Sequence, residues 1–428
     1  MVFYHQLWIG RLYNYFVKKF FFIALGILVG LLAAGTIFIK LNKDTAKSQI
    51  ISPLGKSFSI SSVTKKHENP KYLTYGYLPY WTLEQEKYFQ YDKLTDISFF
   101  GLYINDDGSF KTVTEEGDPN PGYNTWRNSK TLSKIIDAAD KYGTRVSLTV
   151  IAHEDEASDK FLECKSCWET FANNLFKELE FRKLTGVNLN FEYAELTEEE
   201  TADKYTEFVS FINGKLKAKL GEKQFLVVST FADSLVKDRV TKIPDVANAA
   251  DAIFIMGYDF HRPDSDKAGP VAPINGKGIH AEYDIETMLR DYLSYLPPNK
   301  LILGIPYYGY NWVVEEEKPY AERIPGTYEI GFSQSQTYSD IMDTILEVKP
   351  EIKWDDLGKV PYFTYKSPST GSSREVYYEN AESLRIKYDL IRNNKLLGVG
   401  IWALGYDGGY VELWNLLGEY FGNGNNNL

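Results

Sequence analysis

The chain has 428 residues, of which 44% are hydrophobic and 25% charged. These fractions are ordinary for a globular protein with a substantial buried core, and the length fits one large domain. The formal net charge of -11 argues against a nucleic acid as partner, because proteins that bind phosphate backbones use clusters of lysine and arginine.

The N-terminal part contains one long apolar run. Residues 20–39 (FFFIALGILVGLLAAGTIFI) carry no charge and are numerous enough to cross a bilayer as a helix. Because Arg11, Lys18 and Lys19 precede the run, the positive-inside rule places residues 1–19 in the cytoplasm.

We therefore predict a single-pass transmembrane anchor over residues 20–40, with the rest of the chain outside the cytoplasm. A cleaved signal peptide is the alternative, since Ala33 and Ala34 are small, although the run is long for one. Residues 41–70 are rich in polar residues and predict a flexible linker to the folded domain. Residues 423–428 predict a disordered tail.

The only two cysteines, Cys164 and Cys167, have C-x-x-C spacing. Outside the cytoplasm this spacing allows a local disulfide. Two ligands do not make a zinc site, and the sequence contains no phosphate loop, dinucleotide fingerprint or G-x-S-x-G motif. We therefore expect neither a metal nor a cofactor.

After residue 70, short β-rich runs alternate with helical patterns, which is typical of parallel α/β proteins. Most of these runs are continuously apolar, as strands are when both of their faces are covered. We predict a (β/α)8 barrel over residues 71–422. The eight expected strands are residues 72–78, 96–103, 145–151, 186–192, 225–230, 252–259, 301–307 and 398–404.

Residues 311–397 are too many for an ordinary connection between a strand and a helix. They contain two β-like pieces (VPYFTYK and REVYYE) and a helical pattern over 381–393, and so predict a small α+β insertion between strands seven and eight. Elsewhere, Thr197 and Glu200 have capping-box spacing and predict the start of a helix that ends at Gly221.

The fourth expected strand reads GVNLNFEY over residues 186–193. Asn188, Asn190 and Glu192 fall at period two and share the interior face, while the residues between them point toward the helices. Active sites of such barrels form at the C-terminal ends of the strands. A carboxylate that ends this polar row is a candidate catalytic acid, and an interior hydrogen-bonded ladder is the structural alternative.

Two further strands end in polar or aromatic residues. The sixth expected strand ends with Tyr258 and Asp259, and the eighth has Trp402 near its C-terminal end. A tryptophan at this position either forms the floor of a sugar pocket or caps the core. Its position beside Glu192 favours the pocket.

These motifs, in this order, resemble glycoside hydrolase family 18, which includes chitinases and cell-wall hydrolases. The family motif D-G-x-D-x-D-x-E aligns with residues 185–192, and M-x-Y-D matches residues 256–259 unchanged. The seventh strand (LILGIPYYGYNW), the tryptophan of the eighth strand and the insertion are also similar to the family. The substrate-binding candidates that follow from the resemblance are Asn188, Asp259, Met256, Trp402, Tyr77 and Tyr308.

The resemblance implies a membrane-anchored hydrolase of β-1,4-linked, N-acetylglucosamine-containing glycans, such as chitin-like oligomers or peptidoglycan. The implied mechanism is retaining and substrate-assisted, with the N-acetyl oxygen of the sugar as nucleophile. Glu192 would protonate the leaving oxygen and Tyr258 would hold the acetamido oxygen. Asn190 stands where the family has the aspartate that holds the acetamido N–H and stabilises the oxazolinium.

Every aspartate of the fourth-strand motif is replaced here, by Thr185, Asn188 and Asn190. An asparagine still accepts the acetamido N–H but brings no negative charge. Loss of one such stabiliser costs about 3 to 4 kcal/mol, on the order of a hundred- to a thousandfold in rate. The sequence therefore predicts reduced activity. A non-hydrolytic glycan-binding protein is the alternative, and a structural tether at the envelope is a third reading; Glu192 favours the enzyme and Asn190 the binding protein.

Histidines and acids also follow two of the strands. His153, Glu154 and Asp155 are contiguous and lack a distant partner, so a solvated loop explains them better than a metal site. We interpret His261, close to Asp259, in the same way. The same region (SLTVIAHED) lacks the Ser-x-Gly-Gly sequence that is frequent on the third strand of the family.

Overall fold

The computed structural model describes residues 49–51, 57–59, 70–193 and 196–422. The chain divides into two compact units, residues 1–50 with 57–63 and residues 51–56 with 64–428, and each is described by itself. Within the predicted linker, β1 (Gln49–Ile51) pairs with β2 (Ser57–Ser59) in a two-stranded sheet.

The predicted anchor, its alternative cleavage site and the predicted tail all lie outside the described residues. Within the ranges described, no helix is both long and apolar enough to cross a membrane. The anchor therefore stays a prediction.

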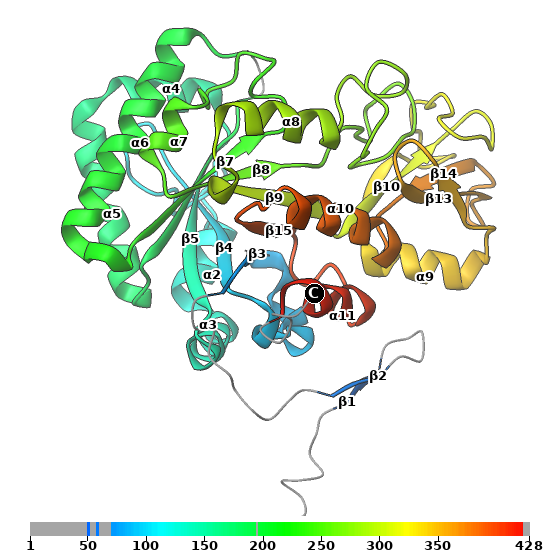
Figure 1. The fold of residues 1–428 in the computed structure, drawn as a ribbon, viewed down its shortest axis with the longest axis horizontal. Helices are drawn as coiled ribbons and strands as arrows, with labels where there is room; N and C mark the ends of the chain where they lie inside the picture. Colours follow the sequence, from blue (N-terminus) through cyan, green and yellow to red (C-terminus); the bar gives the residue numbers. More distant parts are fainter. Residues whose placement is uncertain (1–48, 52–56, 60–69, 194–195, 423–428) are drawn as a thin grey trace, which may run out of the picture. The chain divides into compact units, whose positions relative to one another are not determined.

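The large unit contains a closed barrel of eight parallel strands, which confirms the predicted fold (Figure 1). The order around the barrel is β15-β3-β4-β5-β6-β7-β8-β9, so the last strand closes the barrel against the first. The strands are β3 (Leu73–Pro79), β4 (Asp96–Tyr103), β5 (Arg145–Ala152), β6 (Gly186–Phe191), β7 (Phe225–Phe231), β8 (Ala252–Met256), β9 (Leu301–Pro306) and β15 (Gly398–Trp402).

The predicted strands begin within one residue of the observed ones, but two of them end two or three residues earlier than predicted. β8 ends at Met256 rather than at residue 259, and β15 ends at Trp402 rather than at residue 404. Asp259 has a positive φ of 63°, which no strand accommodates. Tyr258 and Asp259 therefore belong to the loop that follows β8.

Helices surround the barrel, and α4, α5 and α6 lie on the side away from the insertion (Figure 1). Gly221 caps α6 as predicted, but the helix begins at Glu199 and its N-cap Glu198 makes no side-chain cap, so the predicted capping box is wrong. Helices of the barrel layer are α2 (Pro121–Asn128), α3 (Lys130–Tyr142), α4 (Asp155–Glu163), α5 (Lys165–Arg182), α6 (Glu199–Leu220), α7 (Asp245–Ala249), α8 (Ile285–Tyr295), α10 (Ala381–Asn393) and α11 (Glu412–Phe421).

Four short 3-10 helices complete the layer, namely η1 (Tyr80–Tyr88), η2 (Tyr91–Lys93), η3 (Gly221–Lys223) and η4 (Pro298–Lys300). Cys164 and Cys167 form a disulfide at the start of α5, as their spacing allowed.

The insertion is an antiparallel sheet of order β11-β10-β14-β13-β12 with one helix, and it begins at Tyr308 rather than at residue 311. The helix predicted over 381–393 is present as α10, but it contacts β9, β15 and α11 and so belongs to the barrel layer rather than to the insertion. The insertion leaves the barrel directly after β9, so its first strand continues the wall of the barrel mouth. Its elements are β10 (Tyr308–Val313), β11 (Gln334–Thr337), α9 (Tyr338–Val348), β12 (Lys353–Asp355), β13 (Val360–Lys366) and β14 (Ser373–Tyr377).

Side chains of β6 point alternately into the barrel and outward to the helices, as the period-two pattern predicts. Phe191 points outward, with its ring 4.8 Å from Tyr205 and 5.8 Å from Phe208 on α6. Asn188 and Asn190 point into the barrel, where the other strands contribute mostly aromatic and aliphatic side chains. The interior is therefore a packed core in which the polar row of β6 lies beside buried hydroxyls of other strands, such as Ser98, Thr149 and Ser229.

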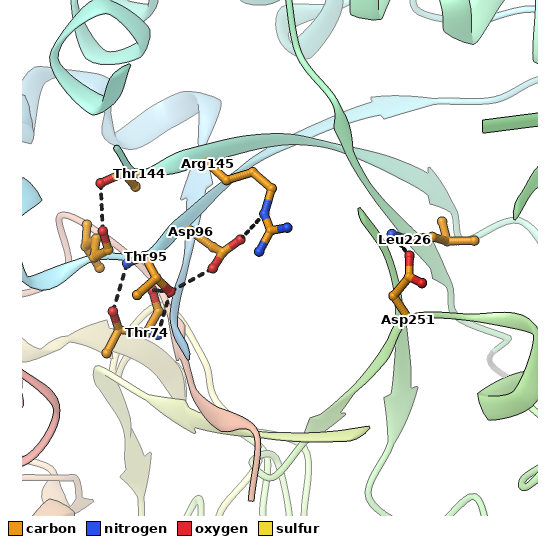
Figure 2. A network of polar contacts seen from close by, with 8 residues as sticks. Thr74, Thr95, Asp96, Thr144, Arg145, Leu226 and Asp251 are labelled. Atoms are coloured by element: carbon orange, nitrogen blue, oxygen red, sulfur yellow. Dashed lines mark hydrogen bonds and ion pairs between the residues drawn. The ribbon is translucent and has the colours of Figure 1, made fainter. Parts of the chain in front are cut away.

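The N-terminal end of the barrel is closed by a separate polar network (Figure 2). Asp96, which is fully buried, accepts a hydrogen bond from Arg145 Nε at 2.6 Å and from Thr95 Oγ1 at 2.7 Å. Loss of Arg145 would leave this buried carboxylate without its counter-charge. The opposite, C-terminal end is where the polar row of β6 reaches solvent.

Candidate active site

Glu192 lies immediately after β6, at the C-terminal mouth of the barrel. Its backbone N–H donates to Ala152 O at 2.9 Å and so extends the pairing of β6 with β5 by one step. Its side chain is 29% exposed, which leaves the carboxylate accessible from the barrel mouth.

Two neighbours bind the same oxygen of this carboxylate. Asn190 Nδ2 donates to Glu192 Oε1 at 2.6 Å, and His153 Nε2 lies 3.3 Å from that oxygen and 3.2 Å from Asn190 Nδ2. Desolvation raises the pKa of Glu192, but the hydrogen bond and charge of His153 and the hydrogen bond of Asn190 outweigh it, so the pKa lies below its ordinary 4.5. The carboxylate is therefore held in its ionised form.

Asn188 lies one step deeper and belongs to a buried network. Its Oδ1 accepts from Tyr77 Oη at 3.2 Å, and its Nδ2 donates to Ser229 Oγ at 3.0 Å. Tyr77 and Ser229 are themselves 2.5 Å apart. This arrangement supports the floor beneath Asn190 and Glu192 and keeps Asn188 away from the groove.

Asp259 receives two tyrosine hydroxyls, from Tyr308 and from Tyr310 at 2.6 Å. The residue is exposed as a whole, but its carboxyl lies among these side chains. Burial of the carboxyl raises the pKa of Asp259. The hydrogen bonds from the two tyrosine hydroxyls and the charge of Arg262 lower it, but by less. Both tyrosines belong to β10, so the insertion positions Asp259.

Tyr258 precedes Asp259 and lines the same mouth. Burial raises the pKa of its hydroxyl well above the ordinary 10.0. The phenol therefore stays protonated at physiological pH and can donate a hydrogen bond to a ligand.

Aromatic side chains form the floor and one side of the mouth. Trp402 is half-buried, with its ring 4.7 Å from Phe100 and 5.3 Å from Tyr77. Trp81, in η1 directly after β3, is 49% exposed and contacts Tyr80 edge-on at 4.8 Å. Flat exposed rings beside polar groups suit the apolar face of a pyranose.

These residues surround a cavity of about 820 Å³, which is large enough for several sugar rings. Of the nine predicted site residues, Asn188 does not line this cavity. The structure brings the other eight together around it, namely Glu192, Asn190, Tyr258, Asp259, Met256, Trp402, Tyr77 and Tyr308.

Among the cavity residues that the sequence interpretation missed are Trp81, Tyr103 and His153. His153 lies in an exposed loop after β5, which confirms the solvated-loop interpretation, and its ring also turns toward Glu192. For His261 that interpretation is wrong, since its ring is buried and lies between Pro270 O and His280 O at 2.8 and 2.9 Å. Among the described residues, no three His, Cys, Asp or Glu side chains are grouped as metal ligands.

A family model described as Glycosyl hydrolases family 18 matches residues 73–407, which include the barrel, the insertion and Glu192. The chain belongs to this family. The resemblance in the strand motifs is thereby confirmed. The fold and the glycosidase class follow from family membership.

Curated relatives of this family 18 protein match only part of its length. It is 25% identical to the putative sporulation-specific glycosylase YdhD of Bacillus subtilis, over 61% of this chain and 56% of that protein. It is 24% identical to di-N-acetylchitobiase of Homo sapiens, over 67% of this chain and 75% of that protein. The match to YdhD thus spans little more than half of that relative.

Solved family structures share the fold. The spore cortex-lytic enzyme SleL of Bacillus megaterium aligns with a TM-score of 0.64 at 21% identity, over 86% of this chain and 77% of that one. A group IV chitinase of Ostrinia furnacalis aligns with a TM-score of 0.67 at 16% identity, over 82% of this chain and 99% of that one.

Proposed function

We propose that the protein hydrolyses β-1,4 linkages in N-acetylglucosamine-containing glycans, with chitin-like oligomers or peptidoglycan as substrates. The observation that carries the proposal is the position of Glu192: a carboxylate at the end of the polar row of β6, in a cavity lined by Trp81, Trp402 and Tyr258. This is the position of the catalytic acid in the family motif.

The proposed reaction is substrate-assisted. Glu192 gives a proton to the glycosidic oxygen while the acetamido oxygen of the same sugar attacks C1, so the C1–O bond breaks as an oxazolinium forms. Water then attacks C1, its proton returns to Glu192, and the product keeps its β configuration. Tyr258 suits the acetamido oxygen because its hydroxyl is always a donor.

Asn190 would hold the acetamido N–H. Its Nδ2 is directed toward Glu192 and His153, which leaves the carbonyl Oδ1 as the acceptor. The amide orients the acetamido group but brings no charge against the oxazolinium, so we propose a slow enzyme.

A non-hydrolytic glycan-binding protein is the second candidate, and one observation favours it. Asn190 and His153 together hold the pKa of Glu192 low, whereas a catalytic acid needs its proton at the working pH. A groove that kept its aromatic side chains would still bind oligosaccharide.

The experiment compares two substrates of the full-length protein. A β-1,4-linked N-acetylglucosamine hexamer should yield products that first appear as the β anomer by NMR, whereas the de-N-acetylated hexamer should stay intact because it lacks the nucleophile. Equal cleavage of both, or an initial α anomer, would contradict the substrate-assisted route.

We also propose that residues 20–40 anchor the protein in the cell membrane with the barrel outside. The proposal rests on the apolar run and the basic residues before it. Protease added to intact cells should degrade the barrel domain. A protected domain, or a mature N-terminus just after Ala34, would overturn the anchor.

A further inference from the structure

The two sides of the cavity differ in charge. In the barrel order, β3 and β4 lie diametrically across from β7 and β8, so side chains that follow these two pairs of strands face each other over the mouth. The aromatic wall consists of Trp81 after β3, Phe100 and Tyr103 on β4, and Trp402 at the end of the neighbouring β15. The cationic wall consists of Lys237, Arg239, Arg262 and Lys277.

Two of the four cations are already neutralised within the protein. Arg239 binds both carboxylate oxygens of Asp233, at 3.1 and 2.8 Å. Lys237 Nζ lies 2.8 Å from Glu282 Oε2 and 3.5 Å from Asp233 Oδ2. This half of the cationic wall therefore has little charge left for a ligand.

Arg262 and Lys277 differ from that pair. The guanidinium of Arg262 is 62% exposed, and its nearest acid, Asp264, is a distant and exposed partner at 3.8 Å. Lys277 Nζ lies 4.8 Å over the ring of Tyr283, and no carboxylate of the described residues is within ion-pairing distance of it. Neither cation has a close carboxylate partner among the described residues, so both can contact an anionic group in the cavity, and the charge of Arg262 also acts on Asp259.

The loop that carries both cations, between β8 and α8, is fixed at several points. The two ring nitrogens of His261 lie 2.8 and 2.9 Å from Pro270 O and His280 O, so this buried ring packs between two distant parts of the loop. Trp312 Nε1 donates to Arg262 O at 3.1 Å, and Lys277 N donates to Asp284 Oδ2 at 2.9 Å. A fixed backbone lowers the entropic cost of holding a ligand between the two side chains.

The protein as a whole carries a net charge of -11, so a cationic wall is not a by-product of general basicity. A neutral chitin oligomer has no group that needs two cations, whereas a carboxylate pairs well with an arginine fork and an ammonium.

We propose that Arg262 and Lys277 bind a carboxylate of the substrate, which makes this groove selective for an N-acetylated amino-sugar chain that carries acidic substituents, as in muramic acid. The neutral N-acetylglucosamine units lie against the aromatic wall. This inference rests on the proposed glycan-binding groove and deepens it.

The test uses full-length protein with Glu192→Gln, which prevents turnover, and measures binding by calorimetry. The probes are a tetramer of N-acetylglucosamine and a peptide-free tetrasaccharide in which N-acetylglucosamine alternates with N-acetylmuramic acid. We expect the acidic probe to bind at least about tenfold more tightly at low salt, with the advantage falling as salt is added.

Arg262→Gln with Lys277→Gln should remove that advantage and leave binding of the neutral probe unchanged. The matched control is Lys267→Gln in the same loop, an exposed lysine that pairs with Glu322 and does not line the cavity. Equal affinity for both probes, or equal effects of the double variant and the control, would overturn the inference while leaving the groove intact. Failure of both probes to bind would overturn the proposed function as well.

Discussion

Asn190 donates its side-chain amide to Glu192, with Nδ2 and Oε1 2.6 Å apart. In the family motif an aspartate occupies the position of Asn190, and an aspartate beside a glutamate raises the pKa of the glutamate. In this protein the neighbour does the opposite, because an amide donor stabilises the carboxylate. The same substitution thus removes a counter-charge for the oxazolinium and makes the acid harder to protonate.

Asn190→Asp should reverse both effects. We expect turnover to rise by up to about a hundredfold, because the new carboxylate opposes the oxazolinium charge. The pKa of Glu192 should rise too, so activity should extend to higher pH. Initial rates on an N-acetylglucosamine hexamer from pH 3 to pH 8 measure both changes. If wild type and variant bind the hexamer and neither cleaves it at any pH, the groove is a binding site.

The pH profile of the wild-type protein follows from the lowered pKa of Glu192. A general acid works only while protonated, so kcat/KM should fall as pH rises through a value below 4.5. An optimum near neutral pH would mean that substrate binding displaces the contacts of Glu192 with His153 and Asn190.

His153→Leu should raise the pKa of Glu192, since it removes a hydrogen bond and a positive charge from Oε1. We expect the decline of kcat/KM to move to higher pH while the maximal rate stays similar. Glu154→Gln is the matched control, because Glu154 is the next residue but lies outside the cavity. Complete loss of activity at every pH in His153→Leu alone would instead make His153 a proton donor.

Trp402→Ala should weaken oligosaccharide binding at least about tenfold, because an aromatic surface of the cavity is lost. Tyr295→Ala on α8, which removes an exposed ring outside the cavity, should leave binding unchanged. Calorimetry on the hexamer and thermal unfolding separate the two roles. Unchanged binding with a large fall in Tm would assign Trp402 to the core.

Glu375, buried in the insertion sheet, should make stability depend on pH. Its carboxyl accepts backbone N–H groups of Tyr320 and Ala321 at 3.1 Å, yet desolvation raises its pKa from 4.5 to about 7. The folded state therefore holds a proton that the unfolded state releases, and stability should fall by up to about 3 kcal/mol as pH rises from 4.5 to 7.

Urea unfolding of Glu375→Gln at several pH values checks this expectation. In the variant, the free energy of unfolding should fall much less between pH 4.5 and 7. Burial also raises the pKa of Asp407 to about 6, so a smaller fall in the free energy of unfolding should remain. Glu351→Gln, at an exposed site, should behave like wild type. An unchanged slope in Glu375→Gln would show that Glu375 is ionised in the folded state.

The barrel could be predicted because its strands follow two simple rules. Strands covered on both faces read as apolar runs, and the period of two placed Asn188 and Asn190 on the inner face of β6. The start of α6 could not be predicted from the capping pattern, because the backbone N–H of Thr197 donates to Asp238 O and the helix begins only at Glu199.

The rest of the site depends on loops and on distant segments. His153 faces Glu192 because of the path that the chain takes after β5, and no sequence period encodes that path. Asp259 is held by Tyr308 and Tyr310 of the insertion, a pairing between residues about fifty positions apart. Trp81 was missed because η1 follows β3 directly and carries it to the mouth.

Hydrolysis of the N-acetylglucosamine hexamer by the full-length protein and by Glu192→Gln, at acid pH, tests the central claim most directly. Glutamine keeps the shape of the side chain and its contact with Asn190 but cannot donate a proton in the reaction. We expect slow cleavage by the wild type and at least about a hundredfold less by the variant, with binding retained in both. Cleavage at the wild-type rate by Glu192→Gln would contradict the assignment of Glu192 as the catalytic acid.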